Sequence, residues 1–242
     1  MTNSHSIINC RIDMNEYAGL FSYTPLSETT CAVTGYNGFE SPSLLIPSQD
    51  PEGRTVVAIA DRAFMNCAAL RAVTLPDSIE SVGARAFAFC INLLDIRFSP
   101  ECRLASIGNR AFIGCERLTV LRFGHLANLV SLGRSAFAYC TRLRSAVLPE
   151  GLSDLAPSLF EGCTALEYVR LPETLTVIGT AAFSACGALR TLTVPSSVKL
   201  IEDCAFAWCG HLSDLHLPET ACLVSGSAFK ECTSLADILR VG

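Results

Sequence analysis

The sequence predicts an α/β solenoid, in which similar coils stack along one axis. The pattern Phe-x-x-Cys-x-x-Leu occurs eight times, and its phenylalanines lie 23 or 25 residues apart. Alanine precedes seven of these phenylalanines, and Leu159 precedes the other. A fixed period in this range indicates units that bury their apolar sides against one another. The repeat phenylalanines are Phe64, Phe87, Phe112, Phe137, Phe160, Phe183, Phe206 and Phe229.

Composition excludes several other classes of protein. Half of the 242 residues are hydrophobic and only 17% are charged, which excludes a disordered chain. No apolar run approaches the roughly 18 residues needed to span a bilayer, so we expect no membrane span. The net charge is −5 and no block of basic residues suggests a nucleic-acid partner. Lysine occurs only at Lys199 and Lys230, and the more frequent arginine favours protein or glycan recognition.

The chain is expected to divide into a cap and a repeat region. Residues 1–55 are predicted to form an N-terminal cap with an atypical first coil. Residues 56–242 carry the eight units, the last one irregular because Arg240 stands where an apolar residue is expected. The residues after Met1 show no basic start followed by an apolar core, so no signal peptide is expected. Taken alone, that observation indicates an intracellular chain.

Each unit is predicted to contain a short turn and then a strand. Phe, Cys and Leu at i, i+3 and i+6 would lie on one side of a helical or 3₁₀ turn. The strand follows the leucine, with inward residues at alternate positions, such as Val73 and Leu75 in one unit and Leu215 and Leu217 in another. Successive strands would stack in register as one parallel sheet, on the concave side because phenylalanine takes more room. The glycines that come later in the unit are predicted to need positive φ: Gly83, Gly108, Gly133 and Gly179.

Eight of the thirteen cysteines occupy the same repeat position. No C-x-x-C pair is present, so we expect these thiols to pack as small apolar residues and to bind no metal. A disulfide is left open among the five other cysteines, which are Cys10, Cys31, Cys102, Cys204 and Cys222.

No catalytic motif or cofactor fingerprint is present, and we expect no cofactor. His211 and His216 flank a predicted strand, which is a weak argument for acid–base chemistry. The second and third units each have two extra residues, near Ser99–Cys102 and Gly124–Ala127. These insertions should bulge from the turn after the strand, where contact loops are frequent.

The outward positions of the predicted strands are the better place for a binding site. Arginine and tyrosine there are residue types that dominate interface energies. The alternative is a solvated sheet surface with Asp–Arg pairs worth under about 1 kcal/mol each. The candidate partner-binding residues are Asp95, Arg97, Arg122, Tyr168, Arg170, Asp214 and His216.

One unit has the pattern Leu-x-x-Val-x-Leu-Pro-x-Ser-Ile-x-x-Val-Gly-x-x-Ala-Phe-x-x-Cys, from Leu70 to Cys90. It resembles the BspA-like leucine-rich repeat, also called the Treponema-type class. The resemblance implies a right-handed coil stack with a parallel concave sheet. It also implies a protein attached to the cell surface or secreted, which binds host matrix proteins or other cells. No functional residue can be transferred, because whole arrays carry that role.

We therefore expect a non-enzymatic module for protein–protein or protein–glycan recognition. The alternative is a structural scaffold that self-associates through its last coil. That coil would present Leu235 and Ile238 at an open sheet edge, and such edges recruit other strands.

Overall fold

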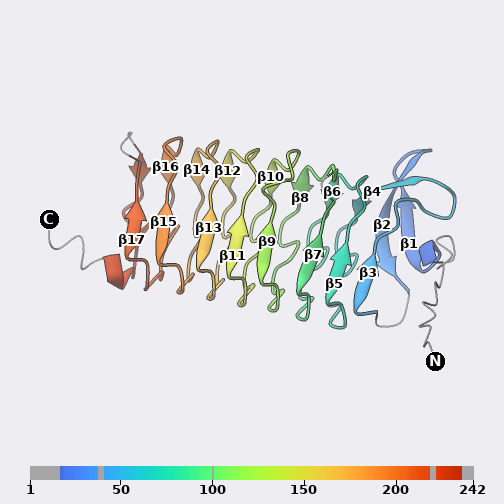
Figure 1. The fold of residues 1–242 in the computed structure, drawn as a ribbon, viewed down its shortest axis with the longest axis horizontal. Coiled ribbons are helices and arrows are strands. Elements are labelled where there is room, and N and C mark those ends of the chain that lie inside the picture. The colour runs from blue at the N-terminus through green and yellow to red at the C-terminus, as the bar shows by residue number, and fades with distance from the viewer. Residues whose placement is uncertain (1–16, 38–40, 100, 219–221, 236–242) are drawn as a thin grey trace, which may run out of the picture.

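A computed structural model describes residues 17–37, 41–99, 101–218 and 222–235. Within these residues the chain is a β-solenoid of stacked parallel strands with almost no helix (Figure 1). Each coil contains one strand of a front series, one strand of a second series and a segment of turns. The front series is β3 Ser43–Leu45, β5 Ala72–Thr74, β7 Asp95–Arg97, β9 Val120–Arg122, β11 Ser145–Val147, β13 Tyr168–Arg170, β15 Thr191–Thr193 and β17 Asp214–His216.

The second series starts next to the N-terminal hairpin. Strands β1 Phe21–Pro25 and β2 Thr30–Tyr36 pair antiparallel, and β2 then pairs parallel with β4. The hairpin thus lies at the N-terminal end of the stack (Figure 1). The second series is β4 Thr55–Ile59, β6 Ser81–Val82, β8 Ser106–Ile107, β10 Ser131–Leu132, β12 Asp154–Leu155, β14 Val177–Ile178, β16 Leu200–Ile201 and β18 Leu223–Val224.

Both series are in register but interrupted. The front series forms three sheets, with breaks between β7 and β9 and between β13 and β15. The second series breaks once, between β10 and β12. Where one series breaks, the other stays paired. Strands β8 and β10 pair beside the break between β7 and β9, and β14 and β16 pair beside the break between β13 and β15. Strands β9 and β11 pair beside the break between β10 and β12. The staggered breaks keep the stack continuous.

The first break in the front series lies beside an aromatic contact. Phe98 and Phe123, inward residues at the ends of neighbouring strands, meet edge to face with ring centroids 5.7 Å apart. Paired strands lie about 4.8 Å apart. Leucine occupies the equivalent site in flanking coils, at Leu75 and Leu148. The break between β7 and β9 therefore coincides with the one aromatic pair at this repeat position among the described coils, whereas Leu171 and Val194 occupy it at the break between β13 and β15.

The predicted helical turn takes another form. Here the residues two before and two after the repeat phenylalanine have positive φ, as in Arg85 (55°) and Phe89 (59°). Left-handed residues at this spacing prevent a continuous helix. Instead, the N–H groups of Arg85, Phe87 and Phe89 donate to carbonyls of the next coil at 2.8–3.0 Å. We call these segments the turn wall: residues 62–67, 85–90, 110–115, 135–140, 158–163, 181–186, 204–209 and 227–232.

The prediction of positive φ at the repeated glycines is wrong. Gly83, Gly108, Gly133 and Gly179 do not have φ in the left-handed region. They are needed because successive coils come close together. A Cβ atom on Gly133 would lie 2.5 Å from the backbone nitrogen of Asn109, and one on Gly83 would lie 2.6 Å from that of Asp61.

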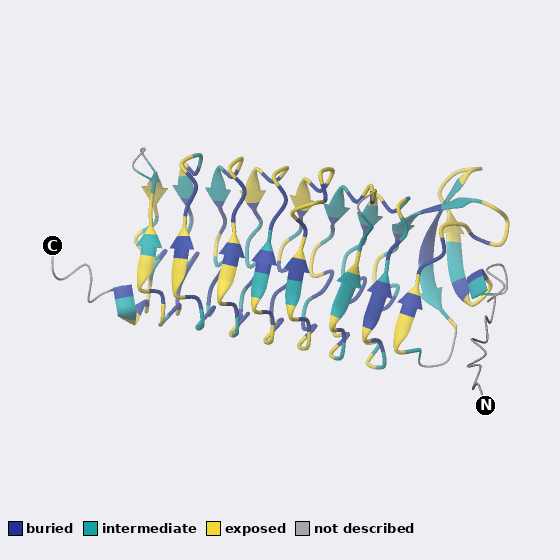
Figure 2. Ribbon diagram, viewed as in Figure 1, coloured by how far each residue is buried: buried dark blue, intermediate teal, exposed yellow. Residues whose placement is uncertain are grey.

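The core is one column of stacked rings inside the turn wall. Neighbouring repeat phenylalanines are 5.0–5.9 Å apart with interplanar angles of 20° or less. Figure 2 shows buried positions continuing from coil to coil along the stack. The concave shape predicted for the sheet stays a prediction.

The last coil differs from the prediction. Leu217 was expected to face inward, but it is 45% exposed because β17 is the edge strand of its sheet. The predicted irregularity at Ile238 and Arg240 lies outside the described residues, as do residues 1–16 of the predicted cap.

Candidate functional site

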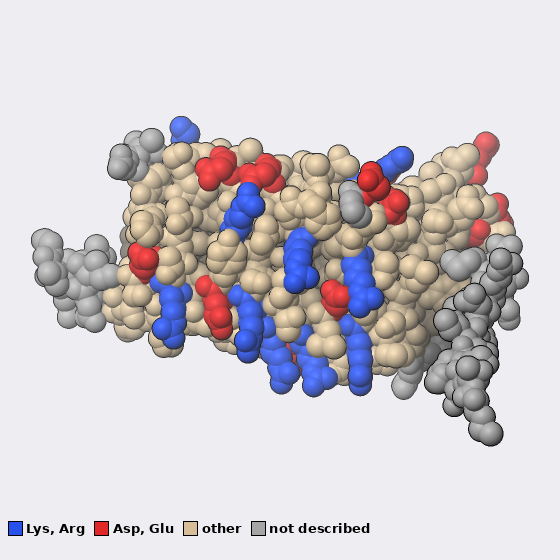
Figure 3. Space-filling view, viewed as in Figure 1, with Lys and Arg blue, Asp and Glu red and all other residues tan. Residues whose placement is uncertain are grey.

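The outward side chains of the front strand series form one face of the molecule, which we call the front face. The seven candidate residues all belong to β7, β9, β13 and β17 of this series. Arg97, Arg122, Tyr168 and Arg170 are exposed, and Val73, Leu121 and Leu192 between such positions are buried. Figure 3 shows basic side chains spread over this face and along its lower edge.

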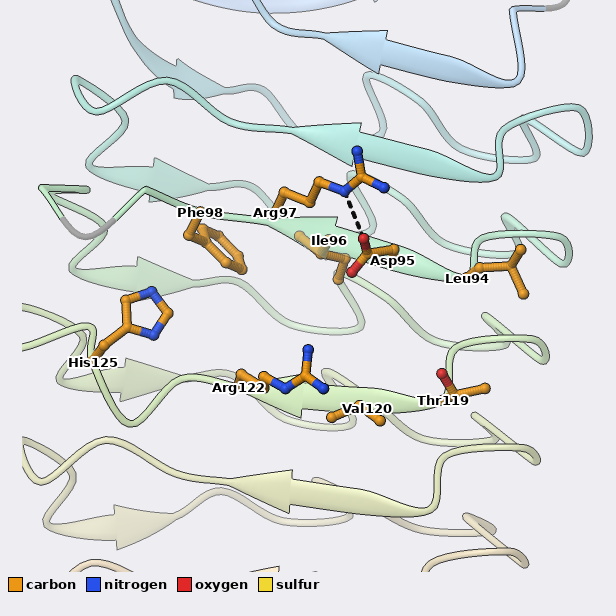
Figure 4. Close-up of a pocket in the computed structure, with 9 residues that line it drawn as sticks. All are labelled: Leu94, Asp95, Ile96, Arg97, Phe98, Thr119, Val120, Arg122 and His125. Atoms are coloured by element: carbon orange, nitrogen blue, oxygen red, sulfur yellow. Dashed lines mark hydrogen bonds and ion pairs between the residues drawn. The ribbon is translucent and has the colours of Figure 1, made fainter.

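The first cleft of the front face lies where β7 and β9 separate. It has a volume of about 500 Å³. Asp95 and Arg97 come from β7, Arg122 comes from β9, and His125 follows in the next loop (Figure 4). The other lining residues are Leu94, Ile96, Phe98, Thr119 and Val120.

Main-chain groups in this cleft lack the partners they have elsewhere. In paired coils the first strand residue donates its N–H to the preceding coil, as Asp95 does to the Arg71 carbonyl (3.3 Å) and Tyr168 to that of Arg144 (3.1 Å). Within the described part of the chain, Val120 has no such bond to Leu94. An unpaired strand edge offers hydrogen bonds to an incoming extended segment.

The charges of the first cleft are only partly neutralised. Arg97 Nε donates to Asp95 Oδ2 at 2.6 Å, and both side chains are largely exposed. Arg122 has no ion pair among the residues that the structure describes. Figure 4 shows Asp95 and Arg122 on facing sides of the gap, while Arg97 folds along its own strand. Arg122 is therefore free to bind an external anion.

A second cleft, of about 530 Å³, lies where β13 and β15 separate. Tyr168 and Arg170 line it together with Arg190. Arg170 donates to Glu150 Oε1 at 3.0 Å, and Tyr168 is 54% exposed. Tyr168 also lines a smaller cleft that contains Arg122, so it borders both Arg122 and the second cleft.

The remaining two candidates stand apart. Asp214 and His216 lie on the edge strand β17 and line neither cleft, and their side chains are 3.6 Å apart. His211 Nδ1 lies 2.5 Å from the Gly187 carbonyl oxygen of the preceding coil. His211 and His216 therefore have separate partners, which leaves the acid–base hypothesis without a shared site.

The sequence prediction included Asp95, Arg97 and Arg122 of the first cleft but not its six other lining residues, among them His125 and Phe98. The insertion at Gly124–Ala127 is the signal that could have identified His125. Phe98 could have been found because it shares its repeat position with Phe123, where the flanking coils have leucine.

The cysteines show no sign of a reactive or metal-binding site. Burial raises the pKa of Cys90 and of Cys209 to about 12, so both thiols are protonated at neutral pH. All twelve cysteines that the structure describes are free thiols, including Cys31, Cys102, Cys204 and Cys222, and Cys10 lies outside that part. The described residues contain no group of three or more potential ligands that could hold a metal ion. They also contain no helix long and apolar enough to cross a bilayer.

Comparison with known proteins gives consistent results. The family described as BspA type Leucine rich repeat region, in six copies, matches residues 57–186 and 130–239. A leucine-rich repeat protein of T. pallidum is similar at 27% identity with a TM-score of 0.72, over 93% of this chain and 92% of that one. One from Bacteroides ovatus is similar at 28% identity with a TM-score of 0.77, over 87% of this chain and 55% of that one. A search of curated proteins found no match. These comparisons indicate no catalytic family.

Proposed function

Because this chain belongs to the BspA-type leucine-rich repeat family, we propose that it is a non-catalytic recognition module that binds a protein partner through the front face. The first cleft carries the proposal. It combines the unpaired main chain of β7 and β9 with Arg122, which has no ion pair within the described structure. A protein segment with acidic side chains suits both features, because its backbone can pair with the strand edge and its carboxylates with arginine.

The separation of the two clefts suggests a partner that spans several coils. Arg97 and Arg122 lie in the first cleft, and Arg170 lies in the second. Tyr168 lines the second cleft and also the smaller cleft that contains Arg122, and it offers an exposed aromatic surface of the kind enriched at interface centres. The two clefts together form the broad surface that a solenoid sheet provides.

The test is a pull-down with the wild type and with the variant Arg97→Glu/Arg122→Glu/Arg170→Glu. The captured protein is then purified and its affinity for each chain is measured. The matched control, Arg62→Glu/Arg85→Glu/Arg110→Glu, makes the same change in net charge on the turn wall. We expect binding to be lost in the front-face variant and kept in the control, with both variants folded. Retained binding in the front-face variant would contradict the proposal and direct attention to the insertion loops near Ser99 and Gly124.

A glycan array with the same three chains separates a glycan ligand from a protein ligand. Strong binding of a neutral glycan that is lost in the front-face variant would replace the protein partner by a glycan at the same face.

A second candidate function is self-association at the C-terminal end. The exposed apolar residues there are Leu217, which directly follows β17, and Leu223 and Val224 on β18, which are 45%, 74% and 40% exposed. Both strands are edge strands. Leu235, which was expected to be exposed, is buried, and Ile238 lies outside the described residues. Edge strands with apolar side chains recruit further strands.

Light scattering over a range of protein concentrations tests this candidate. We expect the mass to rise with concentration and the variant Leu223→Lys to suppress the rise. A strictly monomeric wild type at the highest concentration would exclude it.

A further inference from the structure

A row of arginines on the turn wall is separate from the front face. Arg62, Arg85, Arg110 and Arg134 come from four successive coils, two or three residues before each repeat phenylalanine. All four line one cleft of about 290 Å³, together with Asp61, Ala84 and Asn109. We call this cleft the arginine row.

The arginine row has an excess of positive charge that the protein does not neutralise. None of the four arginines makes an ion pair in the described structure, and three of them are exposed while Arg85 is partly buried. The single carboxylate in the cleft, Asp61, accepts the backbone N–H of Ala84 at 2.7 Å. Asn109 Oδ1 accepts the backbone N–H of Arg134 at 2.8 Å. The side-chain N–H donors of Asn109 have no hydrogen-bond partner among the described residues. Four guanidinium groups therefore face one occupied carboxylate.

The fold itself does not require arginine at these positions. Arg62, Arg85 and Arg110 have φ of 59°, 55° and 58°. In later coils the same position holds Ser158 and Ala181, with φ of 58° and 55°. Small side chains therefore form the same backbone, and the arginines add charge without being needed for packing. Neighbouring like charges repel, so the row costs stability unless a ligand neutralises it.

The spacing of the row restricts the ligand. The phenylalanine rings beneath successive arginines are 5.0, 5.1 and 5.4 Å apart, which sets the repeat of the coils along this wall. Side chains on one face of an extended peptide repeat at about 6.6 Å, which does not match. An acidic helix would need an apolar groove, and Ala84 is the only apolar residue in the lining.

A nucleic acid is also less suitable. Proteins that bind single strands combine basic side chains with aromatic platforms for the bases. No lining residue of the arginine row is aromatic. A polysaccharide with a charged group on successive sugars is a linear polyanion that needs neither the repeat of an extended peptide, nor an apolar groove, nor aromatic platforms.

We propose that the arginine row binds a linear polyanionic glycan that carries sulfate or carboxylate groups. Each guanidinium pairs with one anionic group in a planar, bidentate manner, and Asn109 donates to a sugar or sulfate oxygen. The site is independent of the partner-binding face proposed above, because it is built from other residues on another wall of the coil.

The probes are heparin oligosaccharides of two, four and six sugars, and the measurement is calorimetric affinity at several salt concentrations. The test variant is Arg62→Ser/Arg85→Ser/Arg110→Ser, in which serine follows the example of Ser158. The matched control is Arg97→Ser/Arg122→Ser/Arg170→Ser, which removes the same charge from the front face. Urea unfolding checks that both variants fold like the wild type.

We expect affinity to rise from the disaccharide to the tetrasaccharide and then to level off, because the row spans four coils. The arginine-row variant should lose roughly tenfold or more in affinity, while the control stays close to the wild type. Fully desulfated heparin should not bind.

Three outcomes would overturn the proposal. The first is no binding of heparin by the wild type. The second is an equal loss in both triple variants, which would indicate general charge attraction. The third is tighter binding of single-stranded DNA or polyglutamate through the same residues. A failure here leaves the front-face proposal unaffected, since the test variant of that pull-down changes Arg97, Arg122 and Arg170.

Discussion

At the residue scale, the repeated cysteine does more than fill space. Each cysteine at the repeat position, from Cys90 onward, donates its S–H to the carbonyl of the repeat phenylalanine in the preceding coil, at 3.0–3.4 Å. The same carbonyl also accepts an N–H within its own coil, as Phe64 does from Cys67. Cysteine suits this position because it is small and apolar and still donates a weak hydrogen bond.

The buried thiols at the repeat position predict that the folded protein loses stability at alkaline pH. Burial raises the pKa of Cys90 and Cys209 to about 12, whereas an unfolded thiol titrates near 8.5. As pH rises the unfolded chain releases these protons first. The stability that the protonated buried thiols contribute is therefore complete below about pH 8.5 and is lost as the pH rises toward 12. Each such thiol should lower the free energy of unfolding by about 1.4 kcal/mol per pH unit in this interval.

Urea unfolding at about pH 7.5 and about pH 9.5 measures this effect. The variant Cys163→Ala/Cys186→Ala removes two buried thiols whose pKa burial also raises. Its stability should therefore fall less steeply with pH than that of the wild type. Equal free energies at the two pH values in the wild type would contradict the prediction.

The repeated glycine gives a second prediction at this scale. Gly133→Ala should destabilise the protein by about 1–3 kcal/mol, because the added Cβ meets backbone of the preceding coil that cannot move aside. Gly187→Ala is the control, since a Cβ there has nothing within 4 Å. Thermal unfolding of the two variants tests the pair. Similar melting temperatures for both would mean that the coils are not in close contact at Gly133.

The sequence identified these positions more readily than their roles. A repeat shows that a glycine or cysteine is required once per coil, but it does not show the reason. A repeated glycine can result from positive φ or from close contact with a neighbouring backbone. Only the position of the neighbouring coil distinguishes the two causes. The left-handed residues are in fact Arg85, Phe89 and their equivalents, whose side chains give no signal of that conformation.

At the element scale, the phenylalanine column is the main source of cohesion between coils. Phe137 is fully buried, and its ring lies 5.4 Å from that of Phe112 and 5.9 Å from that of Phe160. Phe137→Ala should cost roughly 3–5 kcal/mol, because it leaves a cavity in mid-stack. It should also uncouple the two halves, so that urea unfolding shows two transitions.

The control for this variant is Phe89→Ala, on the same wall but 46% exposed. We expect it to cost much less than Phe137→Ala. An unchanged melting temperature in Phe137→Ala would refute the role of the column.

Strands were predictable at this scale, and the turn wall and the breaks were not. Period-two alternation after each leucine located the front strands at Ala72–Thr74 and its equivalents. The i, i+3, i+6 spacing of the turn wall is shared by a helix and by a series of tight turns, so spacing alone could not decide. The breaks lie between coils, and a contact beside one of them, Phe98 with Phe123, joins two repeats and is not contained in a single one.

At the scale of the whole molecule, the positions that differ from coil to coil are the ones available for binding. The coil needs its phenylalanine, cysteine and inward strand residues, and it accepts many residues at the outward positions. Arg122 on the front face and Arg85 on the turn wall both occupy such positions. If both proposals hold, two separate surfaces of this kind let one stack bind a protein partner and a polyanionic glycan without competition between them.

The central claim is that the coils are equivalent units on one continuous column. The most direct measurement is a crystal structure of a variant that lacks residues 183–205, which are one period of 23 residues and join Ala182 to Phe206. We predict a folded, shorter stack in which the ring of Phe206 lies on that of Phe160 at the spacing of 5.0–5.9 Å seen throughout the column. A variant that fails to fold, or one in which these two rings lie in separate cores, would contradict the account.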